Sequence, residues 1–266
     1  MARRRRSRRS GGGGATVLGL ALIGAALAAF GLIGWMLFAE ANKPGFNADS
    51  LCPEDGPVRH LAILLDTTDP VSATQLQAAR SRITAMIDAS PAFTRVSFAT
   101  VSPDGGVRRA SFRSLCKPPR DASALTANPR FVAERYRDAF LVPVETTLDG
   151  LLAIPEAPSS PILEALQEFL TEIPGFTTDG TPRDVVLVTD LVQHSDVFSF
   201  YRGGDWTSFR SSGADQRLSR NLAGAEVRIL RLPRPSAPQA AVDDFWVRYL
   251  DAQGAARVLP TVLGDL

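Results

Sequence analysis

The 266-residue chain contains few of the side chains that most often build metal centres and hydrolytic sites. It has only two histidines, His60 and His194, and only two cysteines, Cys52 and Cys116. Neither histidine stands at metal-ligand spacing from a cysteine, and the cysteines do not form a C-x-x-C motif. A zinc-type centre is therefore not expected.

The motifs of common enzyme classes are also missing from the sequence. There is no G-x-S-x-G nucleophile motif, and the four glycines at 11–14 lack the G-K-[ST] ending of a phosphate-binding loop. His194, Ser195 and Asp196 are neighbours in the sequence, whereas a catalytic triad usually combines side chains from distant segments. These observations favour a binding protein over an enzyme.

Positive charge is concentrated at the N-terminus. Six of the 29 basic residues but only one of the 28 acidic residues lie in residues 1–42. The rest of the chain is therefore mildly acidic, and a nucleic-acid partner is not expected.

One long hydrophobic run follows the basic segment. Residues 15–39 contain no charged side chain and, as a helix, would extend roughly 37 Å, enough to cross a hydrocarbon core of about 30 Å. The basic tail at 1–14 predicts a single-pass inner (cell) membrane protein with a cytoplasmic N-terminus and with residues 43–266 in the periplasm or outside the cell. Cleavage at Ala39-Glu40-Ala41 is the alternative, but the apolar region of a signal peptide is shorter, about 7–15 residues.

Both cysteines follow this hydrophobic run. In an oxidising compartment an isolated pair most simply forms a disulfide, and two buried thiols are the alternative. A bond between Cys52 and Cys116 would close a loop of about 60 residues and stabilise the fold by roughly 4 kcal/mol.

Hydrophobic periodicity divides the remaining chain into a linker at 40–57 and one domain at 58–266. Apolar runs typical of strands occur at 60–66, 95–102, 107–115, 184–191 and 225–232. The turn residues at 103–106 predict that the second and third of these runs form an antiparallel hairpin or edge pair. Helical spacing occurs at 71–89, at 129–154 with an expected break at Pro143, at 161–170 and at 241–255. The alternation predicts an α/β fold, with a doubly wound, mostly parallel sheet and helices on both faces.

Residues 193–215 fit neither periodicity and contain several aromatic side chains. Two interpretations stay open for this segment, a binding loop and a packed excursion.

Oxygen-bearing side chains gather where the predicted strands end. Asp66 and Asp190 each follow a buried strand, Thr68 lies in the turn after the first, and Ser160 opens a helix. In a parallel sheet the carboxyl ends of strands share one edge, so these side chains are expected to lie together. Carboxylate and hydroxyl oxygens with added waters suit Mg²⁺ or Mn²⁺.

Helix capping is the alternative explanation for part of this pattern. Asp69-Pro70 and Ser160-Pro161 each have the form of an N-cap followed by proline in the first turn. Capping does not explain Asp66, because a carboxylate at the end of an apolar strand stabilises little unless it is paired.

The segments "LAILLDTTDP", "SSPILEAL" and "VVLVTDL" together resemble von Willebrand factor type A domains, over about residues 58–252. The resemblance implies a metal-ion-dependent adhesion site at which Asp66 and Thr68 match the first turn, Ser160 the helix-opening threonine, and Asp190 the last aspartate. Pro70 replaces the second serine of the D-x-S-x-S turn, and Asp69 is a possible additional ligand.

This resemblance implies a protein-binding module, whose bound metal would take a carboxylate from the partner protein. Two other functions are kept as alternatives. One is an architectural part of an envelope secretion or transfer assembly without metal-dependent binding. The other is metal-assisted hydrolysis at Asp66 and Asp190, which is disfavoured because no histidine or lysine nearby in sequence offers itself as acid or base.

Overall fold

The computed structural model describes residues 13–41, 45–103, 107, 112–120, 128–152, 157–234 and 239–264. Most of the expected basic tail, and part of the expected turn at 103–106, lie outside the described residues. The chain divides into two compact units, Met1–Gly45 and Phe46–Leu266. Each unit is described by itself.

The first unit contains one helix, α1 (Gly13–Ala41). Its stretch Val17–Ala39 is long and apolar enough to cross a membrane, and most of its large apolar side chains are exposed. The sequence-based prediction of one N-terminal apolar helix is confirmed. A helix satisfies its own backbone hydrogen bonds, which is the requirement for a segment surrounded by lipid.

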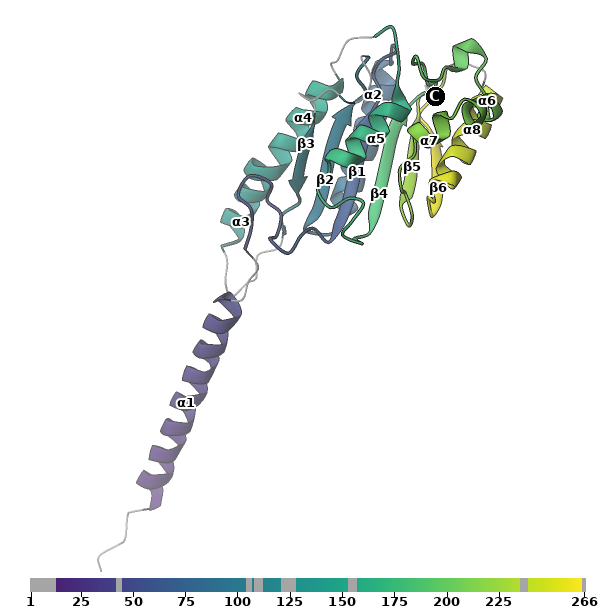
Figure 1. The fold of residues 1–266 in the computed structure, drawn as a ribbon. Coiled ribbons are helices and arrows are strands. Elements are labelled where there is room, and N and C mark those ends of the chain that lie inside the picture. The colour runs from purple at the N-terminus through teal and green to yellow at the C-terminus, as the bar shows by residue number, and fades with distance from the viewer. Residues whose placement is uncertain are drawn as a thin grey trace, which may run out of the picture. The chain divides into compact units, whose positions relative to one another are not determined.

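The second unit is built on a six-stranded mixed sheet with strand order β3-β2-β1-β4-β5-β6 (Figure 1). All neighbouring strands are parallel except β2 and β3, which are antiparallel. The strands are β1 (Arg59–Leu65), β2 (Thr94–Thr100), β3 (Arg113–Cys116), β4 (Arg183–Thr189), β5 (Glu226–Arg231) and β6 (Arg257–Val262). The predicted α/β class, the mostly parallel sheet and the antiparallel edge pair are confirmed.

Helices cover both faces of this sheet because successive strand side chains point to opposite sides. The helices are α2 (Ala73–Ala89), α3 (Pro129–Tyr136), the π-helix η2 (Arg137–Leu141), α4 (Val142–Leu152), α5 (Ile162–Glu172), the 3₁₀-helix η3 (Phe200–Arg202), α6 (Trp206–Ser211), α7 (Ala214–Arg217) and α8 (Gln239–Ala252). Ala62 and Leu64 of β1 pack in one core with α5 and α8, whereas Leu61, Ile63 and Leu65 pack in another with α2, η2 and α4.

Pro143 does not break the helix that the sequence predicts over 129–154. The chain stays helical from Pro129 to Leu152, but residues 137–141 widen into a π-turn, and the Val142 N–H donates to the Arg137 carbonyl. Proline has no N–H and its ring collides with the carbonyl four residues earlier, so a wider turn just before it relieves both problems.

Strand β6 was not among the strands expected from sequence. Its residues lie at the edge of the sheet, are mostly half-buried or exposed, and include Pro260. An edge strand lacks the continuous apolar run that marks a central strand, which explains why periodicity did not detect it.

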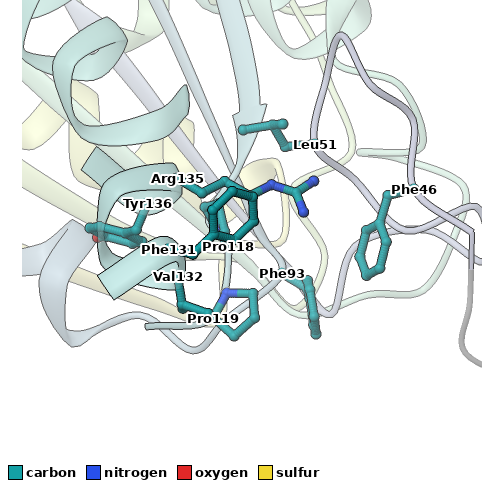
Figure 2. A pocket seen from close by; sticks show the side chains of 9 residues that line it. All are labelled: Phe46, Leu51, Phe93, Pro118, Pro119, Phe131, Val132, Arg135 and Tyr136. Carbon is teal, nitrogen blue, oxygen red and sulfur yellow. The ribbon is translucent and has the colours of Figure 1, made fainter. Parts of the chain in front are cut away.

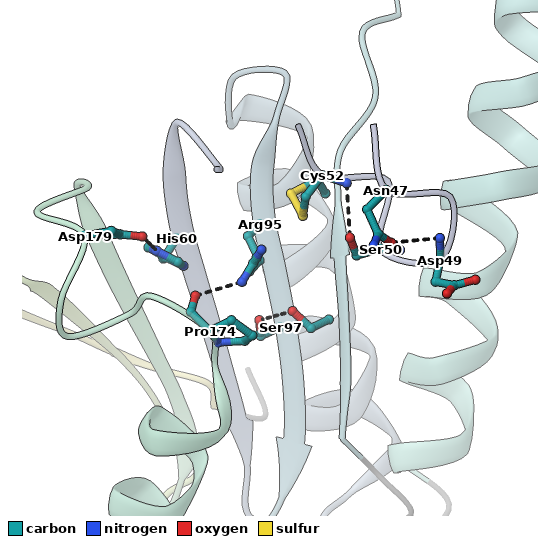
Figure 3. Close-up of a disulfide and its surroundings, with 11 residues drawn as sticks. Asn47, Asp49, Ser50, Cys52, His60, Arg95, Ser97, Pro174 and Asp179 are labelled. Carbon is teal, nitrogen blue, oxygen red and sulfur yellow. Dashed lines mark hydrogen bonds and ion pairs between the residues drawn. A yellow bond between two sulfur atoms is a disulfide. The ribbon is translucent and has the colours of Figure 1, made fainter. Parts of the chain in front are cut away.

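Cys52 and Cys116 form the predicted disulfide, with their Cα atoms 4.8 Å apart (Figure 3). Cys116 is the last residue of β3, and its backbone N–H donates to the Ser50 carbonyl at 2.7 Å. In the same turn the Asn47 side chain accepts from the backbone N–H of Ser50 at 2.8 Å. The bond therefore fixes the chain that precedes β1 to the antiparallel edge of the sheet.

Candidate functional site

The candidate site lies where β1 and β4 end side by side. Asp66 follows the last residue of β1 and Asp190 follows the last residue of β4, and these strands are parallel neighbours paired at Leu65 and Val188. The Asp66 N–H donates to the Val188 carbonyl at 2.8 Å. Both aspartates therefore leave the sheet at the same edge, at the point where the strand order reverses and α/β sheets open a crevice.

Asp66 is the centre of a buried hydrogen-bond network. It is 5% exposed, and its carboxylate accepts four hydrogen bonds, which come from three residues. Oδ1 accepts from the Thr68 hydroxyl at 2.6 Å and the Thr68 N–H at 3.2 Å. Oδ2 accepts from the Thr189 hydroxyl at 2.8 Å and the Ser160 hydroxyl at 3.1 Å. These hydrogen bonds offset the cost of removing the Asp66 carboxylate from water.

The Ser160 hydroxyl is available to this network because the Gln193 side chain takes the N-cap role that the sequence predicts for Ser160. Helix α5 has no cap from Ser160; instead the Gln193 side-chain carbonyl accepts from the Leu163 N–H at 2.9 Å. Backbone hydrogen bonds between Ser160 and His194, at 2.8 and 2.9 Å, hold the two loops together. The capping interpretation of Ser160 is therefore wrong, and its hydroxyl is directed at Asp66.

The capping interpretation of Asp69 is wrong as well. Helix α2 begins after Ser72, whose hydroxyl accepts from the Gln75 N–H at 3.1 Å while the Gln75 side chain accepts from the Ser72 N–H at 3.1 Å. This capping box leaves Asp69 in the loop between β1 and α2.

Asp190 is paired with an arginine that the sequence did not single out. Asp190 Oδ1 accepts from the Val192 N–H at 2.8 Å, and Oδ2 accepts from Arg234 Nε at 3.0 Å. Arg234 Nη2 also lies 3.6 Å from Asp69 Oδ1. Arg234 follows β5, the parallel neighbour of β4, so its loop leaves the sheet at the same edge. The feature of the sequence that could have indicated Arg234 is its position shortly after a third predicted strand.

Hereafter the Asp66 cluster denotes Asp66, Thr68, Asp69, Ser160, Thr189, Asp190 and Arg234. It contains every residue proposed from sequence as a metal ligand, together with Thr189 and Arg234, which the sequence reasoning missed. Thr189 directly precedes Asp190 on a buried strand, which was the available signal for it.

Burial and mutual repulsion dominate the electrostatics of the cluster. The pKa of Asp190 is raised to about 7, because burial disfavours its charged form and the negative charge of Asp66 acts in the same direction. The Val192 N–H and the positive charge of Arg231 oppose this rise. Burial lowers the pKa of Arg234, and the charge of Asp66 opposes that effect.

A hollow of about 280 Å³ opens beside the cluster. Its lining residues are Thr68, Asp69, Ala157, Pro158, Ser159, Ser160, His194 and Tyr201. Tyr201 is 59% exposed, and its ring stands edge-on to His194 with centroids 5.3 Å apart. Burial, and then the charges of Asp190 and Asp66, raise the pKa of the Tyr201 phenol, so it carries its proton at neutral pH and presents both an apolar ring and a hydroxyl.

The segment 193–215, for which two interpretations were open, is a packed excursion. Phe198, Phe200 and Phe209 are buried and surround Phe245 of α8, with ring centroids 4.8 to 5.2 Å from it. This aromatic core anchors the short helices η3 and α6 and holds Tyr201 at the hollow. The exposed Tyr201 therefore lies on a segment that is packed against α8.

His194, Ser195 and Asp196 do not have the geometry of a catalytic triad. His194 Nδ1 contacts the Ser199 hydroxyl at 2.7 Å, and the Ser195 hydroxyl donates to Glu164 at 2.5 Å. The nucleophile and base of a triad would instead be bonded to each other.

A second hollow, of about 260 Å³, is mostly apolar, and Figure 2 shows the side chains that line it. It is lined by Phe46, Leu51, Phe93, Pro118, Pro119, Phe131, Val132, Arg135 and Tyr136. Its walls offer hydrophobic contact and one guanidinium, without the convergent acids or hydroxyls of the Asp66 cluster.

As the Asp66 cluster is arranged, the carboxylate oxygens that would hold a divalent metal ion are engaged by other partners. Within the described residues, no group of three or more histidine, cysteine, aspartate or glutamate side chains is placed to hold a metal. Both oxygens of Asp66 are engaged by donors, and Oδ2 of Asp190 is paired with the positive charge of Arg234. A Mg²⁺ or Mn²⁺ ion would have to displace that charge to reach Asp190.

Comparison of the chain with models of known protein families finds no match, and comparison with curated proteins finds no similar sequence. The fold and the Asp66 cluster with its adjoining hollow are therefore the features that bear on function.

Proposed function

We propose that this chain is a single-pass membrane protein whose folded unit, similar to a von Willebrand factor type A domain, binds another protein at the Asp66 cluster. The observation that carries the proposal is the convergence of the cluster, the hollow beside it and the exposed ring of Tyr201. Tyrosine is among the residues that most often dominate protein interfaces, and Tyr201 lines the hollow beside the cluster.

The likeness to type A domains is supported by the placement of the matched residues. The first matched turn follows β1, the matched serine precedes α5 and the matched aspartate follows β4, all at one edge of a mostly parallel sheet. Ligand sites of α/β sheets form at such an edge, so the fold supports the proposed binding role alongside the resemblance.

The proposed topology places the folded unit outside the cytoplasm. Helix α1 is long and apolar enough to cross a membrane, and the arginine-rich segment lies on its N-terminal side. The disulfide supports an oxidising location for residues 52 and 116. A reporter active only in the periplasm, fused after Leu266, is expected to be active; activity of a cytoplasmic reporter at this position would reverse the topology.

Site-specific photo-crosslinking in the native cells tests the binding proposal. A photoreactive phenylalanine analogue at position 201 is expected to give a discrete adduct with one protein. The same analogue at Phe131, which is 63% exposed and lines the apolar hollow instead, is the matched control.

An adduct from position 131 without one from position 201 would favour the architectural alternative, in which other surfaces make the contacts. Absence of an adduct from position 201 at full surface expression would contradict binding at the Asp66 cluster. Screening for phosphoester or ester hydrolysis distinguishes the binding proposal from the enzyme alternative. The enzyme alternative predicts turnover by the wild-type protein that is lost in Asp66→Ala.

A further inference from the structure

The negative charge of the Asp66 cluster is partly balanced from within the chain. Three carboxylates, those of Asp66, Asp69 and Asp190, face a loop edge at which Arg234 supplies a positive charge. Arg234 is only 21% exposed at its side chain, and the Asp190 side chain is 2% exposed. The pair is therefore part of the interior of the site and is not a solvent-exposed surface contact.

Arg234 contacts two of the residues that the sequence analysis names as possible metal ligands. Its Nε donates to Asp190 Oδ2, while Asp190 Oδ1 accepts from the Val192 N–H. Its Nη2 lies 3.6 Å from Asp69, the residue that offered an additional oxygen after the loss of a hydroxyl at Pro70. The guanidinium thus lies between Asp190, one of the two matched aspartates, and Asp69, the possible additional ligand.

We propose that Arg234 takes the place of the divalent cation, so that the Asp66 cluster recognises its partner without a metal. This inference rests on the proposed function. It assigns the positive charge of the binding surface to a side chain of the protein, Arg234. A guanidinium bridging carboxylates removes part of their repulsion, as an ion would, and it cannot be extracted by a chelator.

Two features of the sequence agree with the replacement of a divalent cation by Arg234. Pro70 has no hydroxyl to offer a metal, and Arg234 leaves the neighbouring strand at the right edge to reach Asp190. A bound Mg²⁺ and the guanidinium would repel each other at one carboxylate, so metal binding and the Arg234–Asp190 pair exclude each other.

Manganese titration of the full-length protein in detergent tests the proposal without any partner. Free Mn²⁺ is followed by electron paramagnetic resonance after removal of trace metals. Wild-type protein is expected to take up no Mn²⁺ at the cluster. Arg234→Gln is expected to bind Mn²⁺ with an affinity about tenfold or more above the weakest that the titration detects, the scale on which neighbouring groups alter metal affinity. Addition of Asp66→Asn to Arg234→Gln is expected to abolish that gain.

Two control variants separate charge from general disruption. Arg248→Gln removes an exposed arginine that pairs with Asp244 on α8, and it is expected to behave as wild type. Arg234→Lys keeps a positive charge at the cluster and is expected to exclude Mn²⁺. Arg234→Ala serves as a second removal of the guanidinium if Arg234→Gln loses its cooperative thermal transition.

Each result decides the proposal. Uptake of Mn²⁺ by wild type that is lost in Asp66→Asn would overturn it, because a metal would then coexist with Arg234. Folded Arg234→Gln or Arg234→Ala protein that still takes up no Mn²⁺ would also overturn it, because exclusion would then not come from Arg234. Since no partner enters the titration, these outcomes are independent of the crosslinking result.

Discussion

Asp66 illustrates how a buried charge is stabilised by single hydroxyl groups. The Thr68 hydroxyl donates to its carboxylate at 2.6 Å within the buried network of the Asp66 cluster. A hydrogen bond to a charged group contributes about 1.5–3 kcal/mol, and a buried carboxylate that loses a donor keeps its desolvation penalty.

Thr68→Val is therefore expected to lower the free energy of unfolding by about 1.5–3 kcal/mol, measured by urea denaturation. Thr147→Val is the matched control, because the Thr147 hydroxyl donates at 2.7 Å to the neutral carbonyl of Pro143. The control is expected to lose about 1 kcal/mol or less. Equal losses in the two variants would contradict a special role for the Asp66 carboxylate.

His60 is another buried titratable residue, and it lies on the interior strand β1. Its Nε2 lies 2.8 Å from Asp179 Oδ2, while Nδ1 is buried and has no hydrogen-bond partner within the described part of the chain (Figure 3). Burial lowers the pKa of His60 below 6.5, and the hydrogen bond to Asp179 opposes this effect. The folded protein therefore holds His60 neutral at pH values where the unfolded chain binds a proton.

This difference predicts that the contribution of His60 to stability is present above pH 6.5 and is lost as the pH falls through its lowered pKa. In urea denaturation between pH 7.5 and pH 5, wild type is expected to lose stability relative to His60→Gln, which cannot titrate. Subtracting the two profiles removes the contributions of other groups, including Asp190. A difference that is constant with pH would contradict the assignment.

At the scale of elements, the start of α2 distinguishes two capping residues. Ser72 forms a capping box with Gln75, whereas Asp69 lies three residues earlier beside Arg234. Ser72→Ala is expected to lower the free energy of unfolding by about 1 kcal/mol, the usual value of an N-cap side chain.

Asp69→Ala is the comparison variant for this helix. It is expected to leave the unfolding free energy within about 0.5 kcal/mol of wild type, because the contact of Asp69 with Arg234 is long and partly exposed. A larger loss in Asp69→Ala than in Ser72→Ala would return the capping role to Asp69.

At the scale of the whole molecule, the disulfide closes a loop with a sequence separation of 64 between Cys52 and Cys116. The loop contains β1, α2 and β2, so the bond restricts a large part of the unfolded chain. Replacement of both cysteines by alanine is expected to lower the unfolding free energy by about 4 kcal/mol.

Urea denaturation of the oxidised protein and the double variant measures this loss. Reduction of the wild-type protein is the control, and it is expected to give a similar loss without a change of sequence. Nonreducing mass spectrometry of the untreated protein should find the two cysteine-containing peptides linked. Alkylation of both thiols without a reductant would contradict the bond.

Periodicity in the sequence was sufficient for the apolar helix α1, for most strands and helices, and for the two aspartates that follow β1 and β4. These features depend on a residue and its near neighbours, so the sequence alone determines them. The same local reasoning misplaced the caps at Asp69 and Ser160, because Ser72 and Gln193 compete for those roles and Gln193 comes from a distant loop.

Only the tertiary structure decided which side chains meet. The pair of Arg234 with Asp190 exists because β4 and β5 are parallel neighbours, and Tyr201 is held at the hollow because phenylalanines of its own segment pack on α8. Both contacts depend on strand order and on packing between distant segments. Hydrophobic spacing along a single chain carries no information about either.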